Sequence, residues 1–84
     1  MLRVSVISPE RVVFEGETDA LVAPAFDGEV GILTGHAPMM TLLGRGTLRI
    51  GGGAGGRRFD VAGGFLQVVD DRVRVVTERA VEGR

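Results

Sequence analysis

Apolar and polar residues alternate along most of this chain with a repeat of two. Near the start, Leu2, Val4 and Val6 are each separated by a single residue. A period of two places such residues on one face of a β-strand, whereas an amphipathic helix needs apolar residues three and four positions apart. No segment before residue 78 fits a helix convincingly, so the pattern predicts an all-β protein.

Turn-forming residues divide this pattern into short segments. The expected strands cover residues 2–7, 12–14, 18–24, 28–33, 39–43, 47–50, 57–62, 65–69 and 73–77. Asp70 and Asp71 form a candidate two-residue turn before the last of them. Short strands at close spacing, with turn signals between them, are typical of a sandwich or barrel. We therefore expect a single domain over residues 1–84, a flattened β-sandwich or barrel of about nine to ten short strands.

Composition removes several classes of function. The 84 residues include no cysteine, which excludes disulfides, thiolate metal sites and thiol catalysis. A net charge of −1 and only four aromatic residues argue against a nucleic-acid interface. The longest apolar stretch, residues 20–26, is too short to span a bilayer, and the start lacks the core of a signal peptide. These features are typical of a soluble, cytosol-type domain.

Two glycine clusters allow a structural and a functional interpretation. A phosphate-binding loop over residues 51–56 would need a following helix and usually a lysine, and the chain has no lysine. We interpret residues 51–56 as a flexible hairpin tip. Gly63 and Gly64 fit a corner where two backbones approach closely, with a binding role as the alternative.

The only histidine, His36, lies in the shaped loop Gly35-His36-Ala37-Pro38. Catalysis would require an oriented partner, and no metal-ligand spacing is visible around it, so we expect neither catalysis nor a metal site. Two interpretations remain open: the imidazole bonds the loop backbone, or it contacts a partner protein.

Asp27 and Glu29 flank Gly28, and alternation places two residues separated by one on the same face. They are interpreted either as solvated acids or as part of a docking surface.

Six motifs, in this order and spacing, resemble the N-terminal β-sandwich of the epsilon subunit of bacterial F-type ATP synthases. The motifs occupy residues 4–10, 13–17, 28–33, 35–41, 46–50 and 59–68. The specific signal is Gly-Ile-Leu at 31–33 followed by Gly-His-Ala-Pro at 35–38 and by Gly-Gly-Phe at 63–65. The resemblance covers nearly the whole chain.

The resemblance implies a sandwich of about ten strands and a non-catalytic role in a rotor, coupling the gamma stalk to the c-ring during ATP synthesis. It implies a peripheral position, through the complex, on the cytoplasmic face of the bacterial inner membrane. No cofactor is expected. The family's c-ring loop is matched by Phe26, Asp27, Gly28 and Glu29, with Glu29 as the best candidate contact. Its gamma-contact positions are matched by Ser8, His36, Thr41, Ala62 and Gln67.

Two departures from the family pattern bear on rigidity and regulation. Thr34 stands where the family usually has proline before Gly-His-Ala-Pro, which predicts a less rigid loop. The family's C-terminal pair of helices, which can inhibit ATP hydrolysis and in some members binds ATP, has no counterpart in residues 78–84. We expect a naturally short subunit whose last seven residues form at most a short tail.

Two other classes of function stay as alternatives. The first is a small β-sandwich module that binds a ligand through the Gly35-His36-Ala37-Pro38 loop. The second is an enzyme, which the lack of any nucleophile or acid–base constellation disfavours.

Overall fold

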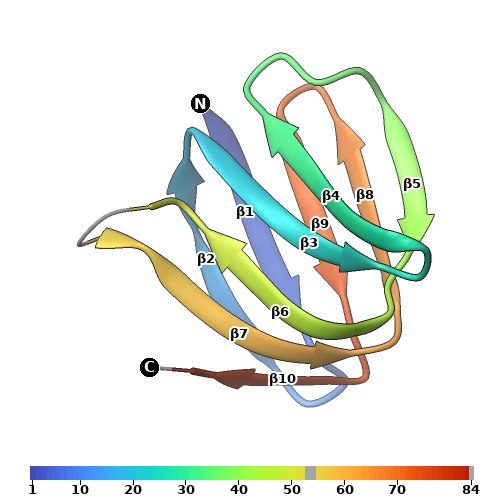
Figure 1. Ribbon diagram of the computed structural model, residues 1–84. Coiled ribbons are helices and arrows are strands. Elements are labelled where there is room, and N and C mark those ends of the chain that lie inside the picture. Colours follow the sequence, from blue (N-terminus) through green and yellow to red (C-terminus); the bar gives the residue numbers. More distant parts are fainter. Residues whose placement is uncertain (53–54, 84) are drawn as a thin grey trace.

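A computed structural model describes residues 1–52 and 55–83, and within them it contains ten β-strands and no α-helix. Figure 1 labels the strands along the chain. Their bounds are β1 Leu2–Ile7, β2 Val12–Thr18, β3 Ala20–Ala25, β4 Gly28–Leu33, β5 Met39–Leu42, β6 Arg45–Ile50, β7 Arg57–Ala62, β8 Phe65–Val69, β9 Arg72–Val76 and β10 Arg79–Glu82.

The strands form two five-stranded sheets that pack face to face (Figure 1). Sheet A has the order β2-β1-β9-β8-β5, and sheet B has the order β10-β7-β6-β3-β4. The pairing of β1 with β9 is parallel, and the other paired strands run antiparallel. The predicted all-β sandwich of about ten strands is therefore confirmed.

The core lies between the sheets and is built by the alternation seen in the sequence. Leu2, Val4 and Val6 have no exposed surface, while Arg3 between them is exposed. The remaining buried apolar residues are Leu21, Ala23, Ile32, Leu43, Leu48, Ile50, Phe59, Val61, Leu66, Val68, Val73 and Val75. Phe14 adds to one open side of the sandwich, where its ring lies 5.7 Å from that of Phe59.

A buried threonine stands at two places where the chain passes from sheet A to sheet B. Thr18 joins β2 to β3, and its hydroxyl lies 3.1 Å from the carbonyl oxygen of Ala20. Thr77 follows β9, and its hydroxyl lies 3.0 Å from the carbonyl oxygen of Arg79 and 3.3 Å from that of Ala62. These hydroxyls bond the backbone two residues ahead, which fixes a sharp change of direction.

The expectation of a short tail after Thr77 is wrong. Arg79–Glu82 forms β10, which pairs with β7 at the edge of sheet B. The change of direction at Thr77 leads the chain to that edge. The strand is also held by its last residue, because the Glu82 carboxylate accepts hydrogen bonds of 2.5 and 2.9 Å from Arg57. The segment has only four residues, with a charged residue at each end, so its own pattern carried no strand signal.

The turn predicted at Asp70 and Asp71 and the corner predicted at Gly63 and Gly64 are confirmed. Asp70 and Asp71 have φ values of 50° and 61°, as a two-residue hairpin turn requires. Gly64 has a φ of 99°, and a Cβ there would lie 1.9 Å from the carbonyl oxygen of Val76. Two backbone segments therefore approach each other closely at Gly64. Residues 51–56 join the antiparallel strands β6 and β7 as a hairpin connection does, but the predicted tip residues 53 and 54 lie outside the described part.

Candidate interaction surfaces

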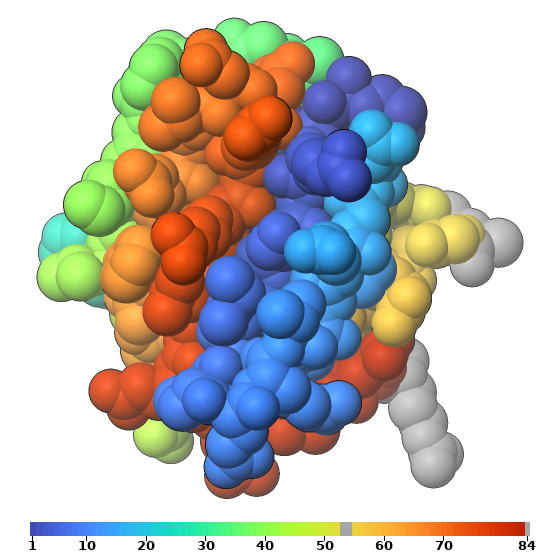
Figure 2. Space-filling view, turned by 180° about the vertical axis from the view of Figure 1, so that it is seen from behind, coloured from blue at the N-terminus to red at the C-terminus, as the bar shows by residue number. Residues whose placement is uncertain are grey.

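The outer face of sheet A carries three rows of side chains that cross the strands. Figure 2 looks onto this face. The strand registers give an apolar row of Val12, Ile7, Val76, Phe65 and Leu42. A central row follows with Glu15, Ser5, Arg74, Gln67 and Met40. A charged row ends the face with Glu17, Arg3, Arg72 and Val69.

The apolar row spans all five strands of sheet A without a polar residue. Its two ends are the most exposed, with 54% of Val12 and 62% of Leu42 accessible to solvent. The three middle residues are half-buried. Contiguous exposed apolar residues of this kind are typical of a surface that another protein covers. The sequence did not reveal this row. Each of its members is an apolar residue at a strand position where alternation would place a polar, outward-facing one.

Two predicted gamma-contact residues flank this face at opposite ends. Ser8 follows β1 beside the apolar row, and its backbone N–H donates to the carbonyl oxygen of Arg11 over 2.9 Å. His36 lies beyond the charged row, where the neighbouring Gly35 N–H donates to the Asp71 carboxylate over 2.7 Å. The His36 Nδ1 lies 2.7 Å from the carbonyl oxygen of Ala37, so the imidazole does bond its own loop backbone.

The other three predicted gamma contacts differ in position. Gln67 is a member of the central row, opposite Met40. Thr41 lies on the edge strand β5 opposite the fully buried Leu66, so its half-buried side chain points toward the interior. Ala62 belongs to sheet B and pairs with Arg45 and Arg79. Four of the five predicted residues thus surround or occupy the outer face and edge of sheet A, and Ala62 does not.

The predicted c-ring loop is the turn between β3 and β4. Phe26 is 67% exposed, and Gly28 has a φ of 133°, a conformation that side-chain-bearing residues resist. The Phe26 N–H donates to the carbonyl oxygen of Leu42 over 3.0 Å, so this turn adjoins the end of the apolar row. Asp27 and Glu29 are both exposed.

Glu29 has a partner that the sequence did not reveal. Its carboxylate lies 3.4 Å from the Arg49 guanidinium, and the two side chains are 61% and 44% exposed. Arg49 belongs to β6 and Glu29 to β4, with β3 between them, so only the sheet order brings the pair together.

Among residues 1–52 and 55–83, no group of three or more His, Asp or Glu is placed to hold a metal ion. Over the same residues, no helix is long and apolar enough to cross a membrane. Five hollows are lined by described residues. Each includes at least one arginine, four also include an acidic residue, and His36 lines none of the five. The fold and surfaces define a β-sandwich interaction module.

Comparison with known families identifies which module this is. Residues 1–83 match the family described as "ATP synthase, Delta/Epsilon chain, beta-sandwich domain". The chain belongs to this family, and the resemblance seen in its motifs is confirmed.

Curated relatives named ATP synthase epsilon chain cover most of the chain. The protein of Leptospira borgpetersenii is 46% identical over 77 residues, which are 92% of this chain and 61% of that protein. The protein of Rhodopirellula baltica is 46% identical over 80 residues, 95% and 62% of the two chains. The chain thus spans about three fifths of these relatives. By contrast, the Caulobacter vibrioides protein is 41% identical over 81 residues, 96% of this chain and 94% of that protein.

Two solved structures with the same fold come from mitochondrial enzymes. A chain in the Euglena gracilis mitochondrial ATP synthase structure, described as OSCP/F1/c-ring, superposes with a TM-score of 0.86 at 25% identity. The match covers 96% of this chain and 52% of that one. A chain of the Tetrahymena thermophila enzyme has a TM-score of 0.76 at 18% identity, covers 95% and 65% of the two chains, and supports the fold alone.

Proposed function

We propose that this chain is a non-catalytic rotor subunit of a proton-translocating F-type ATP synthase, in which it joins the gamma stalk to the c-ring. The family membership and the relatives named ATP synthase epsilon chain support this role. The fold match to a chain in a complex that includes the c-ring supports it as well. In this role the chain sits on the cytoplasmic face of the bacterial inner membrane, held there only through the complex.

The apolar row on sheet A is the observation that carries the assignment of the gamma-docking face. A row that crosses five strands supplies an apolar centre, and the polar rows beside it supply a rim. Ser8, His36, Thr41 and Gln67 surround or occupy the same face and its edge, which agrees with their proposed gamma contacts. Ala62 would need a second part of gamma that reaches sheet B.

The β3–β4 turn is the proposed c-ring contact, through Phe26, Asp27, Gly28 and Glu29. Exposed carboxylates and one exposed aromatic ring suit contact with the polar loops of another subunit. Because Phe26 bonds to Leu42, this turn is continuous with the gamma-docking face. A single small domain can therefore contact both partners through neighbouring surfaces.

Binding to purified gamma subunit tests the docking face. Leu42→Asp and Val12→Asp place charges at the two exposed ends of the apolar row, where they leave the core intact. We expect the double variant to weaken gamma binding by at least about tenfold, because an unpaired carboxylate would be desolvated at the interface. Isothermal titration calorimetry measures the affinity.

Arg58→Glu is the matched control, since it makes the same net charge change at an exposed residue of sheet B, at the end of β7 away from Ala62. Its gamma affinity should stay unchanged. Equal affinity of the Leu42/Val12 double variant and the unaltered chain would remove the outer face of sheet A from the gamma interface.

A further inference from the structure

We propose that Arg3, Arg72 and Arg74 bind carboxylates on the protein that covers the apolar row, and so select a partner that is apolar along one line and acidic beside it. This inference rests on the proposed function, because it specifies the chemistry of the surface that docks on sheet A.

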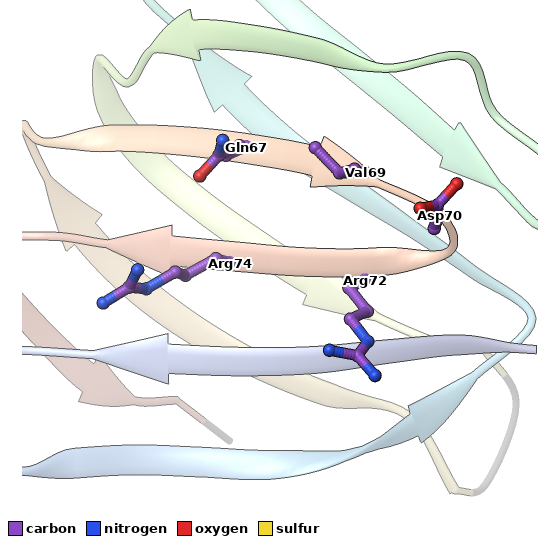
Figure 3. Close-up of a pocket in the computed structure, with 5 residues that line it drawn as sticks. All are labelled: Gln67, Val69, Asp70, Arg72 and Arg74. Atoms are coloured by element: carbon purple, nitrogen blue, oxygen red, sulfur yellow. The ribbon is translucent and has the colours of Figure 1, made fainter.

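The three arginines occupy neighbouring positions on the two strands that meet in the middle part of the sheet. Arg3 of β1 is paired in register with Arg72 of β9, and Arg74 lies two residues further along β9. All three side chains are exposed. Figure 3 shows Arg72 and Arg74 extending from β9 toward β1, with Gln67 of β8 on the other side.

Two adjoining hollows give the cluster its shape. The first has a volume of about 570 Å³ and is lined by Gln67, Val69, Asp70, Arg72 and Arg74. The second, of about 340 Å³, is lined by Arg3, Ser5, Ile7, Arg72, Val73 and Arg74. The two hollows share Arg72 and Arg74, so these two arginines line both of them. Ile7 connects the second hollow to the apolar row.

Folding accounts for only part of this arrangement. Arg3 faces Glu17 of β2 on one side, but Arg72 has Arg3 and Val69 as its register partners, and Arg74 has Ser5 and Gln67. Arg3 and Arg72 are side by side on strands that lie about 4.8 Å apart, and neighbouring like charges destabilise a sheet. The ion pairs found within residues 1–52 and 55–83 join Arg49 to Glu29 and Arg57 to Glu82, and they leave these three arginines out. A local rule broken without a gain inside the fold is expected at a functional surface.

The acidic groups of the same face stand at its margins. Glu15 and Glu17 lie on the edge strand β2, with Glu17 opposite Arg3, and Asp70 lies in the β8–β9 turn at one end of the first hollow. The Asp71 carboxylate already accepts the Gly35 N–H. Positive charge is thus concentrated on β1 and β9, beside the apolar row, where a docked partner would cover it.

These dimensions define the partner element. Five strands at a spacing of about 4.8 Å make the apolar row about 19 Å long, which is the length of a helix of roughly 13 residues. The arginines lie one and two rows away, at about 7 and 13 Å. Arginine binds carboxylates in a bidentate manner. The matching element therefore lies across the strands, with apolar residues on one side and Asp or Glu on the flank over β1 and β9.

The test measures association with purified gamma subunit at 50 and 300 mM NaCl by stopped-flow mixing. The variant Arg3→Gln/Arg72→Gln/Arg74→Gln should associate about tenfold more slowly at the lower salt and lose most of the salt dependence, because steering and pairing by the guanidinium groups are gone. The matched control, Arg49→Gln/Arg58→Glu, makes the same charge change on sheet B, at the end of β6 and β7 away from Ala62, and should behave as the unaltered chain.

The outcomes separate the inference from the proposed function. Weak gamma binding by Leu42→Asp/Val12→Asp, with normal association of the sheet A arginine variant, would overturn this inference and keep the docking face. Normal binding by both variants would overturn this inference and also the docking face on sheet A. Calorimetric titration of the free chain with inorganic phosphate forms a second arm. Saturable phosphate binding that the sheet A arginine variant alone abolishes would assign the cluster to a small anion and overturn the inference.

Discussion

Glu29 shows how a single exposed carboxylate can serve both the fold and a partner. It is held by Arg49 from two strands away, yet 61% of its side chain remains accessible. Exposed ion pairs contribute at most about 1 kcal/mol to stability, so a basic group on a docking subunit can replace Arg49 at low cost. The ion pair therefore orients the Glu29 side chain, while the stability of the domain depends little on it.

Charge reversal at the β3–β4 turn should weaken attachment to the c-ring and leave the domain folded. We expect Glu29→Lys with Asp27→Lys to reduce affinity of the gamma-bound chain for the ring by about 1 kcal/mol, roughly fivefold, because rim charges contribute modestly. Co-sedimentation with purified c-ring measures this. Asp19→Lys is the control, as Asp19 lies beside Thr34 at the other end of β4. Undiminished ring binding by the double variant would exclude the turn as the contact.

The Arg57–Glu82 pair should give the domain a dependence on pH at the acid end. Two hydrogen bonds from Arg57, and its positive charge, hold the pKa of the Glu82 carboxyl below its usual value. A carboxyl with a lowered folded pKa stabilises above its unfolded pKa of about 4.3, and this contribution is lost as the pH falls through the folded value. Glu82→Gln should therefore lower Tm at pH 7 and converge with the unaltered chain in strong acid.

Glu78→Gln provides the reference for that measurement, since Glu78 is also exposed and lies just before β10. A Tm difference at Glu82 that persists undiminished at pH 2 would contradict the role of this ion pair. Arg57 also lies 5.1 Å from the Phe14 ring centre and 5.8 Å from that of Phe59, so Arg57→Lys should lose stacking as well as the bidentate contact.

At this scale the sequence predicted side-chain environments well where period-two alternation applied, and poorly where distant strands meet. Leu2, Val4 and Val6 could be assigned to the core because their spacing alone determines a strand face. The Arg49–Glu29 contact could not be predicted, because the order of strands in sheet B is set by long-range pairing.

Among the elements, β10 was the strand that the sequence did not reveal. Its placement depends on Thr77, a single buried hydroxyl, and on the free edge of β7. Removing residues 79–84 would therefore not trim a loose tail. It would expose the edge of sheet B, which is an aggregation hazard in its own right.

Thr77→Val should loosen β10 more than the rest of sheet B. The substitution keeps the shape and removes a hydroxyl that is only 2% exposed, so we expect a loss of about 1–2 kcal/mol in the free energy of unfolding. Urea titration measures the loss, and faster amide exchange at Arg79–Glu82 would locate it. Thr47→Val, which removes an exposed 3.3 Å bond to Asp60, should cost less. Equal losses in the free energy of unfolding for Thr77→Val and Thr47→Val would show that the buried Thr77 hydroxyl has no special role in placing β10.

The predicted strands otherwise agree with the observed ones within a few residues. The largest difference is β2, predicted over 12–14 and observed as Val12–Thr18. The predicted strand stops before Glu15, Gly16 and Glu17, but pairing with β1 carries these residues into the sheet. Tertiary contacts here override local propensity.

For the whole molecule, the parallel pairing of β1 with β9 predicts slow folding. Val4 and Val73 are register partners although most of the chain lies between them, and such long-range pairing limits folding of β-proteins to the millisecond-to-second range. Stopped-flow refolding from urea, followed by far-ultraviolet circular dichroism, measures the rate. Relaxation within microseconds would show that local structure, not this pairing, controls folding.

The two proposed surfaces could be predicted to different extents from the sequence. The β3–β4 turn was assigned from the resemblance and is exposed, as a contact must be. The docking face of sheet A could not be assembled, because its rows draw one residue from each of several strands whose lateral order no local pattern encodes.

The junction beside Leu42 has a mechanical consequence under the proposed function. Phe26 N–H donates to the Leu42 carbonyl, and Gly44 N–H donates to the Pro24 carbonyl over 2.8 Å, so main-chain bonds fasten the β3–β4 turn to the segment after β5. Torque that enters at the turn and leaves through sheet A would load these few bonds directly, over a short path. The domain would then act as a stiff coupling, in which the main chain carries the strain and the surrounding side chains are free to vary.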